Sequence, residues 1–234
     1  MKKTVLITGA SKGIGKATAI EFAKNGYDIA ISYLTSEKEA SELKNTVEKL
    51  YNVKVLTIKV DISNEKDVIN MVSEVKDKFG KIDVLINNAA YYNDNNYLDK
   101  TKDEFMRVLE VNVVGTFLVT KYATKIIDKG TVINVSSRDS VDTYNELSMD
   151  YCASKAGVNS LAQTFSLARP NIQFMSVLLP WVSTESVQEM YPEYLQNELK
   201  RTNQKRLVEP DEVAKVLYDL INENIKSGSI IRKI

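Results

Sequence analysis

The stretch Thr8-Gly9-Ala10-Ser11-Lys12-Gly13-Ile14-Gly15 follows a short apolar run at residues 3–8 and opens a helical pattern that continues from Ile14 to about Lys24. Glycines at a strand-to-helix turn let backbone N–H groups approach a phosphate, and the N-terminus of the helix adds positive potential there. A tight turn without a ligand would have the same composition. Because these glycines stand directly between the first strand and the first helix, their context favours a phosphate-binding turn.

Strand and helix patterns alternate along the rest of the chain. Short runs rich in Val and Ile predict strands at 28–32, 54–60, 83–86, 131–135, 172–178 and 229–232. Helices are predicted at 36–50, up to residue 79 after an N-cap at Ser63, at 101–127 (one long helix or a broken pair), at 149–168 and at 210–223, while residues 183–200 are expected to be irregular to helical. Apolar strands of this kind are typical of a parallel sheet covered on both faces. We therefore expect one α/β domain over residues 1–234, a doubly wound parallel sheet of about seven strands with helices on both faces.

Composition excludes several classes of function. Lys plus Arg and Asp plus Glu each number 31 among 234 residues, so the net charge is zero, which argues against a nucleic-acid surface built on bulk positive charge. No apolar run approaches the ~20 residues needed to span a bilayer, so no membrane is expected among the partners. With no His and a single Cys, a hydrolase with a histidine base is excluded and no metal site is expected. The single Cys also fits a reducing compartment such as the cytoplasm.

Tyr151 and Lys155 form the second constellation of interest, within the predicted helix 149–168. Residues i and i+4 share one face of a helix. A cation beside a phenol lowers the pKa of the phenol, which can then act as a general acid or base. Taken alone, the pair could equally be solvated helix surface.

Seven features, in order along the chain, resemble the short-chain dehydrogenase/reductase family. They are the T-G-x-x-x-G-x-G motif, Asp61 after the third strand, Asn87-Asn88-Ala89 after the fourth, Asn112 in a helix, Ser136-Ser137 after the fifth, Tyr151-x-x-x-Lys155, and Pro180-Trp181-Val182-Ser183-Thr184 after the sixth. The resemblance covers almost the whole chain. It implies a Rossmann-type fold and an NAD(P)-dependent oxidoreductase that reduces a carbonyl to an alcohol or runs the reverse reaction.

The resemblance also implies catalytic roles for four residues. Tyr151 would give a proton to a carbonyl oxygen or take one from an alcohol, and Lys155 would lower the tyrosine pKa and hold the nicotinamide ribose. Ser137 would hydrogen-bond the substrate oxygen, and Asn112 would hold a water behind the lysine. Hydride transfer leaves charge on oxygen, which such donors would neutralise.

Three departures from the family pattern affect the site. Ala90 stands where the family usually has glycine, and Trp181 follows Pro180 in place of a glycine. The spacing from Ser137 to the tyrosine is one residue longer than is common, so Ser136 and Ser140 stay open as alternatives to Ser137.

For the cofactor, the resemblance implies contacts with Gly9, Ser11, Lys12, Gly13, Ile14, Gly15, Ser32, Tyr33, Asp61, Ile62, Asn88, Ala89, Tyr151, Lys155, Val182 and Thr184. NAD enzymes of this fold usually place an acid near the end of the second strand, and residues 31–36 hold none. Lys12 could pair with a 2′-phosphate or be a solvated loop lysine. We therefore predict NADP(H) as the preferred cofactor, with NAD(H) still possible.

The substrate is expected to be a small carbonyl or alcohol under a lid around residues 181–208. In motif style the chain is most similar to 3-oxoacyl-(acyl-carrier-protein) reductases. Lys200-Arg201 and Lys205-Arg206 could receive an acidic carrier protein, although paired basic residues are more often solvated surface. A reductase of sugars or small ketones, and a non-catalytic or weakly active dinucleotide-binding protein, stay open. The family also implies a homo-oligomer, either a dimer or a tetramer.

Overall fold

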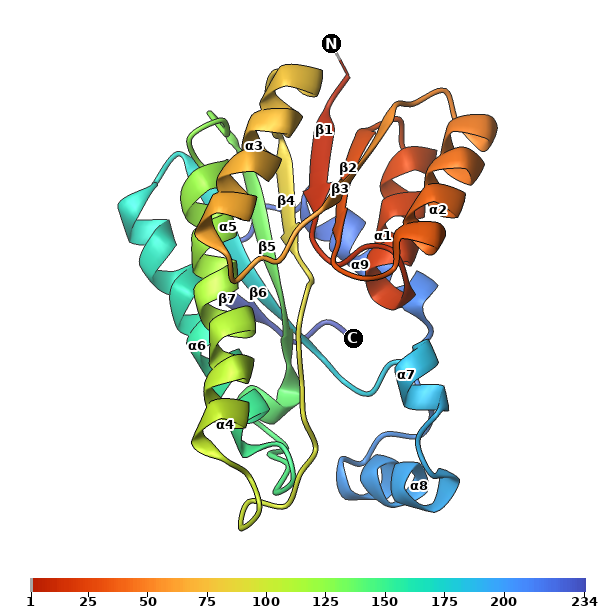
Figure 1. The fold of residues 1–234 in the computed structure, drawn as a ribbon, viewed down its shortest axis with the longest axis vertical. Coiled ribbons are helices and arrows are strands. Elements are labelled where there is room, and N and C mark those ends of the chain that lie inside the picture. Colours follow the sequence, from red (N-terminus) through yellow and green to blue (C-terminus); the bar gives the residue numbers. More distant parts are fainter. Residues whose placement is uncertain (1) are drawn as a thin grey trace.

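A seven-stranded sheet runs through the middle of the structure, in the order β3-β2-β1-β4-β5-β6-β7 (Figure 1). The computed structural model describes residues 2–234. The strands are β1 (Thr4–Ile7), β2 (Asp28–Tyr33), β3 (Val55–Lys59), β4 (Val84–Asn87), β5 (Gly130–Ser137), β6 (Ile172–Leu179) and β7 (Ser229–Ile231). Every neighbouring pair is parallel. The order reverses between β1 and β4, and the expected doubly wound fold is confirmed.

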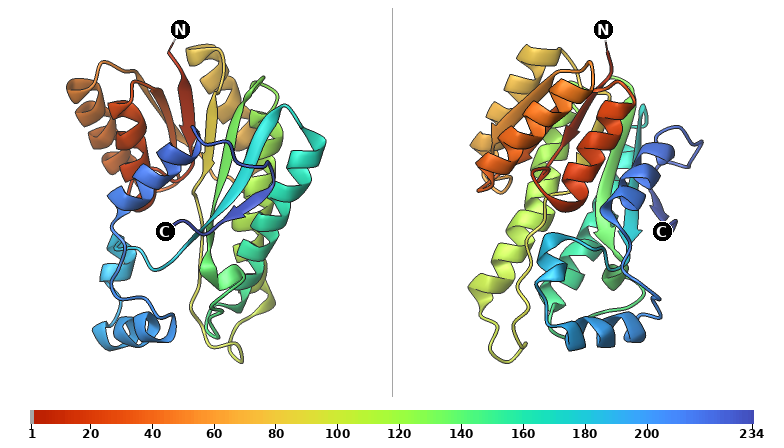
Figure 2. Two further views of the ribbon diagram at one scale, coloured as in Figure 1. Left: turned by 180° about the vertical axis from the view of Figure 1, so that it is seen from behind. Right: turned by 90° about the vertical axis from the view of Figure 1, so that its right-hand side faces the viewer.

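Helices cover both faces of this sheet (Figure 2). They are α1 (Gly13–Lys24), α2 (Glu37–Leu50), α3 (Glu65–Phe79), α4 (Lys102–Leu109), α5 (Thr116–Ala123), α6 (Met149–Ala168), α7 (Glu185–Gln188), α8 (Pro192–Arg201) and α9 (Pro210–Leu220). One face packs against α1, α2 and α9, and the other against α3, α5 and α6. Within residues 2–234, no helix combines the length and apolar character that crossing a bilayer requires.

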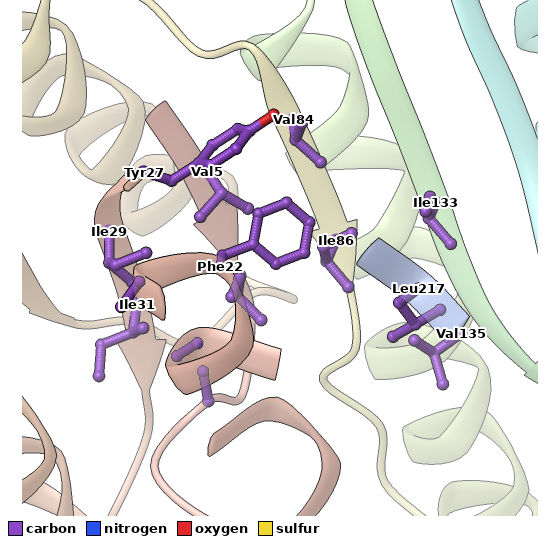
Figure 3. Packing of buried hydrophobic residues seen from close by; sticks show 14 of the residues in the cluster. Val5, Phe22, Tyr27, Ile29, Ile31, Val84, Ile86, Ile133, Val135 and Leu217 are labelled. Atoms are coloured by element: carbon purple, nitrogen blue, oxygen red, sulfur yellow. The ribbon is translucent and has the colours of Figure 1, made fainter. Parts of the chain in front are cut away.

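The short β1 strand shows why the strands are apolar throughout. Its side chains point alternately to the two faces, so Val5 and Ile7 enter the core under α1 while Leu6 enters the core under α3. On the α1 side, the Phe22 ring meets the Tyr27 ring edge-on at 5.1 Å between centroids (Figure 3). Both faces of the strand are therefore dry, as the run of apolar residues predicted.

The predicted long helix at 101–127 is one rod with a defect in its middle. α4 and α5 are joined by a π-helical turn over Glu110–Gly115, a rare feature that often occurs at functional sites. A Cβ added to Gly115 would lie 2.8 Å from the Ile62 side chain, so only glycine allows the rod to approach the end of β3 this closely. Asn112 lies inside this turn.

The N-cap of α3 differs from the prediction. Asn64, not Ser63, caps the helix: its side-chain oxygen accepts hydrogen bonds from the N–H groups of Lys66 and Asp67. Ser63 is occupied elsewhere, because its hydroxyl donates to the Asp61 carboxylate at 2.6 Å. Ser63 and Asn64 are both residue types that can cap a helix. Because Ser63 is bonded to Asp61, Asn64 is the one that caps α3.

α7 and α8 lie beyond the carboxyl ends of the strands (Figures 1 and 2). Val182 and Val208 form an isolated parallel bridge, so the chain leaves the sheet and returns to it at neighbouring points. This excursion brings residues 183–207 over the edge of the sheet where ligands of doubly wound folds bind.

Candidate active site

A cavity of about 650 Å³ lies at the carboxyl ends of the strands, between the glycine turn, α6 and the excursion. Most of the predicted site residues line it, from seven separate parts of the chain: Gly9, Lys12, Gly13, Ile14, Ser32, Tyr33, Asp61, Ile62, Asn88, Ala89, Ser137, Tyr151, Lys155, Val182 and Thr184. The predicted residues Ser11, Gly15 and Asn112 lie behind this wall and do not line it.

The glycine turn is shaped for a close approach. Gly9 and Gly13 have φ angles of +63° and +51°, in the left-handed region that favours glycine. A Cβ on Gly9 would lie 2.8 Å from the Cα of Ala89. α1 then begins with no side-chain cap and no acidic residue in its first turn, so its N-terminal N–H groups and positive dipole end can serve an anion. These features fit the pyrophosphate of a dinucleotide.

Gly15 has a packing role, which explains why it does not line the cavity. A Cβ there would meet the Gly9 carbonyl oxygen at 2.5 Å and the Asn88 side chain at 2.7 Å. Asn88 in turn donates to the carbonyl oxygens of Thr8 and Gly9 at 3.0 and 2.9 Å. Gly15 therefore lets α1 pack tightly on the turn that Asn88 holds in place.

Tyr151 and Lys155 lie side by side on α6, at the cavity wall. The Lys155 Nζ is 5.5 Å from the centre of the Tyr151 ring and donates to the Val135 carbonyl oxygen at 2.8 Å. Lys155 is 3% exposed, so its ammonium has left bulk water with a neutral carbonyl as its partner.

Burial sets the pKa values of this pair, and it corrects one expectation. Burial raises the pKa of Tyr151 above its usual value, and the nearby Asp139 carboxylate adds to that rise. Burial also lowers the pKa of Lys155 to about 8. The expected lowering of the tyrosine pKa by Lys155 is therefore overridden in the protein alone. Tyr151 keeps its proton at neutral pH, the form in which it can act as an acid.

Ser137 and the two alternatives differ in their hydrogen bonds, although Ser136 lines the cavity as well. Ser140 donates to the Ser137 carbonyl oxygen at 2.5 Å and does not line the cavity. Ser136 is 2% exposed and directs its hydroxyl to the Lys155 carbonyl oxygen at 3.3 Å. Ser137 Oγ accepts a hydrogen bond from the Asp139 N–H at 3.1 Å, so its own hydrogen can still be donated into the cavity.

The Asn112 side chain makes three hydrogen bonds inside the protein. Its side-chain oxygen accepts the Tyr91 N–H at 2.7 Å, and its amide donates to the Tyr91 carbonyl at 2.8 Å and to Ser154 Oγ at 2.9 Å. Both donor hydrogens of this amide are thus used inside the protein. These bonds fix the loop after β4, a role that no spacing in the sequence indicates, and the expected part of Asn112 in holding a water stays a prediction.

Arg107 on α4 is a cavity residue that the sequence did not reveal. Its guanidinium donates to Asp61 at 3.1 Å and to Ser63 Oγ at 2.9 Å. Burial alone would raise the pKa of Asp61, but the hydrogen bonds from Ser63 and Arg107 outweigh it and hold that pKa below its usual value. Arg107 and Asp61 are 46 positions apart in the chain, so no local sequence pattern predicts their contact.

Besides Asp61, four carboxylates line the cavity: Asp94, Asp139, Glu185 and Glu189. Glu185 lies beside the glycine turn, since a Cβ added to Gly13 would lie 3.5 Å from its Oε2. Asp94 and Asp139 lie in the substrate half, near enough to Tyr151 that, besides burial, both carboxylates raise the pKa of its phenol. This half of the cavity is therefore rich in hydrogen-bond acceptors.

Lys12 is not free in the structure. Its Nζ lies 3.1 Å from Glu39 Oε1 on α2, and both side chains are largely exposed. A backbone hydrogen bond and the bond from Lys12 lower the pKa of Glu39, so this carboxylate is charged at neutral pH. Glu39 lies in the first turn of α2, which follows β2.

The family model described as short chain dehydrogenase matches residues 3–195 of the chain. Among curated proteins, the chain is similar to glucose 1-dehydrogenase 2 of Bacillus subtilis, with 30% identity over 94% of this chain and 88% of that protein. The glycine turn, the Tyr–Lys pair and Ser137 all fall within the matched region.

Solved structures show the same architecture. A short-chain dehydrogenase/reductase of Serratia marcescens superposes with a TM-score of 0.93 at 24% identity, covering 98% of this chain and 95% of that chain. A short-chain dehydrogenase of Burkholderia cenocepacia in complex with NADP gives a TM-score of 0.89 at 25% identity, with the same coverage of both chains.

Removing the Lys155 charge should change how stability depends on pH. A lysine whose pKa is about 8 when folded and about 10.4 when unfolded binds fewer protons in the folded state between those values, so stability rises with pH in that window. Between pH 7 and 10, wild type should therefore gain about 2 kcal/mol in unfolding free energy relative to Lys155→Met. Urea denaturation at each pH measures this, and parallel curves for the two proteins would contradict it.

Proposed function

The chain belongs to the short-chain dehydrogenase/reductase family and is an oxidoreductase, and we propose that it uses NADP(H) to reduce a small polar carbonyl compound to an alcohol, or to run the reverse reaction. The proposal rests above all on one observation. The Tyr151–Lys155 pair stands in the wall of the same cavity that begins at the glycine turn. A dinucleotide site and a proton donor thus share one space.

The residues that would hold the dinucleotide follow from the cavity wall. The turn from Gly9 to Ile14 would take the pyrophosphate, Ser32 and Tyr33 the adenosine ribose, and Asp61 and Ile62 the adenine. Lys155 would hold the nicotinamide ribose, with Val182 and Thr184 near the carboxamide. When bound, the nicotinamide supplies or accepts a hydride.

Tyr151 would give its proton to the substrate oxygen, and Ser137 would hydrogen-bond that oxygen. A charge developing on oxygen is stabilised by donors already in place. Because burial raises the pKa of Tyr151, the phenol holds its proton at neutral pH and suits reduction. The reverse reaction would need the phenolate, and should therefore gain rate as the pH rises.

The preference for NADP(H) is supported by the charges around the adenosine end. No acid stands between Tyr33 and Ser36, whereas Lys12 lines the cavity there. Its ion pair with Glu39 joins exposed groups, and exposed pairs are weak. A 2′-phosphate, which carries more charge than one carboxylate, would compete well for Lys12.

Two variants should change the affinity for NADPH in opposite directions. Lys12→Ala should raise the Kd for NADPH about tenfold, because a charge-assisted hydrogen bond is lost, while Glu39→Gln should lower it by releasing Lys12. The Kd for NADH should change little in either case. Fluorescence titration measures all of these constants. A wild type that binds NADH more tightly than NADPH would refute the preference.

Among substrates, the acceptor-rich half of the cavity favours neutral compounds that carry hydroxyl groups. Asp94, Asp139 and Glu189 can accept hydrogen bonds from hydroxyls and would repel an anion. The similar Bacillus subtilis protein is named as a glucose dehydrogenase, which also supports sugars or small hydroxyketones. Residues 181–208, which comprise the excursion at 183–207 and its flanking residues, would form the lid of this cavity.

A 3-oxoacyl thioester on an acidic carrier protein is a weaker candidate. Of the four basic residues considered for carrier docking, Arg201 donates to Glu198 at 2.6 Å and Arg206 to Glu212 at 2.7 Å. The charge left to attract an acidic partner is therefore small. Motif style alone supports this substrate.

Tyr151→Phe tests the reaction itself. With NADPH and a panel of sugars, hydroxyketones, simple ketones and acetoacetyl thioesters, the variant should lose ~10²- to 10⁴-fold in kcat, while its Kd for NADPH stays within about twofold, because only a hydroxyl is removed. Tyr191→Phe, at a side chain 86% exposed, is the matched control and should behave as wild type. A wild type that binds NADPH and reduces nothing in the panel would favour a non-catalytic binding protein.

We also propose a homo-oligomer, formed through the outer face of α5 and α6. Val114 in the π-helical turn, Phe117 on α5 and Leu167 on α6 are 44%, 40% and 84% exposed, and the Phe117 ring lies 6.0 Å from the Phe165 ring. Contiguous exposed apolar side chains commonly mark protein contacts.

Sedimentation equilibrium tests this assembly. Wild type should sediment with at least twice the mass of one chain, and Phe117→Glu should sediment with a lower mass because a charge would be placed in the apolar contact. A wild type that sediments as a single chain at micromolar concentration would show that this face is not an interface.

A further inference from the structure

A buried ion pair joins the loop after β4 to the first turn of α6. Lys100 Nζ donates to both carboxylate oxygens of Asp150, each at 2.7 Å, and to the Asn93 carbonyl oxygen at 2.6 Å. The two side chains are 4% and 0% exposed. The three hydrogens of the ammonium are therefore all directed to protein oxygens, away from water.

The burial of this pair sets it apart from the other ion pairs between residues 2 and 234. In each of those, at least one side chain is 36% exposed or more. Removing two charges from water is costly, and a buried pair adds little to stability compared with apolar residues of similar size. A gain in stability therefore does not explain why Lys100 and Asp150 are buried together beside the cavity.

One end of the pair reaches Tyr151. Asp150 Oδ1, which accepts from Lys100, also accepts the backbone N–H of Tyr151 at 2.9 Å. First-turn N–H groups lack partners inside a helix, and the preceding Ser148 makes no capping bond. Asp150 thus satisfies the Tyr151 N–H, and Lys100 fixes the Asp150 carboxylate that does so.

The other end reaches the substrate half of the cavity. The segment between Asn93 and Lys100 forms no helix or strand. Of the cavity residues, Tyr91 and Tyr92 come just before this segment and Asp94 lies at its start. The hydrogen bond from Lys100 to the Asn93 carbonyl oxygen joins the two ends of this segment. Two further contacts run in parallel: Ser148 donates to Asp94, and Asn112 clamps Tyr91.

We propose that the Lys100–Asp150 pair is a positioning device, which holds the loop at residues 91–99 and the Tyr151 backbone in one fixed geometry. This inference rests on the proposed function, since it concerns the distance between the proton donor and the substrate wall. Neither Lys100 nor Asp150 lines the cavity. They act through Tyr151 and through the loop.

The first test is kinetic. Lys100→Met and Asp150→Asn each leave a buried charge without its partner, so each should lower kcat/KM for the carbonyl about tenfold to a hundredfold, as misplacement of reacting groups does. The KM for the carbonyl should rise and kcat should fall, while the Kd for NADPH stays within about twofold of wild type, because the dinucleotide half of the cavity is not touched. Lys215→Met, in an exposed pair on α9, is the matched control and should not differ from wild type.

The double variant Lys100→Met/Asp150→Asn removes both charges. Because the two residues act as one unit, its loss in kcat/KM should be no greater than that of the worse single variant. The double variant can also be assayed if the single variant Lys100→Met does not fold. Losses that multiply in the double variant would show that the residues act independently and would overturn the proposal.

Amide hydrogen exchange gives a readout that needs no turnover. In Lys100→Met, the Tyr151 amide and those of residues 91–99 should exchange faster than in wild type, while β1 and α9 keep their rates. Unchanged exchange at Tyr151, or a kinetic loss that follows NADPH affinity or melting temperature alone, would overturn the positioning role. If wild type reduces no carbonyl, the proposed function fails, and exchange at Tyr151 still decides whether the pair holds the loop to the helix.

Discussion

The active site depends on the burial of one ammonium group. Lys155 places its charge at the end of β5, 3% exposed, against the Val135 carbonyl. This is possible because α6 packs directly on β5 and β6, and that packing also brings Tyr151, one turn earlier, to the cavity wall. Burial then sets the chemistry of both groups: the phenol keeps its proton, and the lysine titrates near pH 8. A charge so poorly compensated is what a bound ribose and nucleotide could satisfy.

Much of the fold could be predicted because the governing signals are local. Val5, Leu6 and Ile7 alternate between two dry faces, which an apolar strand in a parallel sheet requires. The same holds for α6, whose predicted and observed bounds agree, Met149–Ala168. The prediction was wrong at the N-cap of α3, where a contact with another residue decides which side chain caps the helix. Asn64 caps α3 because Ser63 is held by Asp61, and sequence order alone does not show that choice.

The candidate site divides in the same way. The glycine turn and the Tyr–Lys pair have fixed spacings on single elements, so they were found. Arg107, the Lys12–Glu39 pair and the clamp from Asn112 to Tyr91 join segments far apart in the chain, and the sequence carries no sign of them. The sign of the pKa shift at Tyr151 was missed for a related reason, since burial is a property of the assembled protein. The loop after β4 is thus held by contacts that appear only after folding.

The central claim is that Tyr151 and Lys155 serve a hydride transfer between a nicotinamide and a carbonyl compound in one cavity. The most direct measurement uses NADPH that carries deuterium at the transferred position, mixed with a sugar or hydroxyketone that wild type reduces. Mass spectrometry of the product should show one deuterium on the carbinol carbon, and Tyr151→Phe should form this product ~10²- to 10⁴-fold more slowly. Deuterium that appears only in water, or an alcohol formed equally well by Tyr151→Phe, would contradict the account.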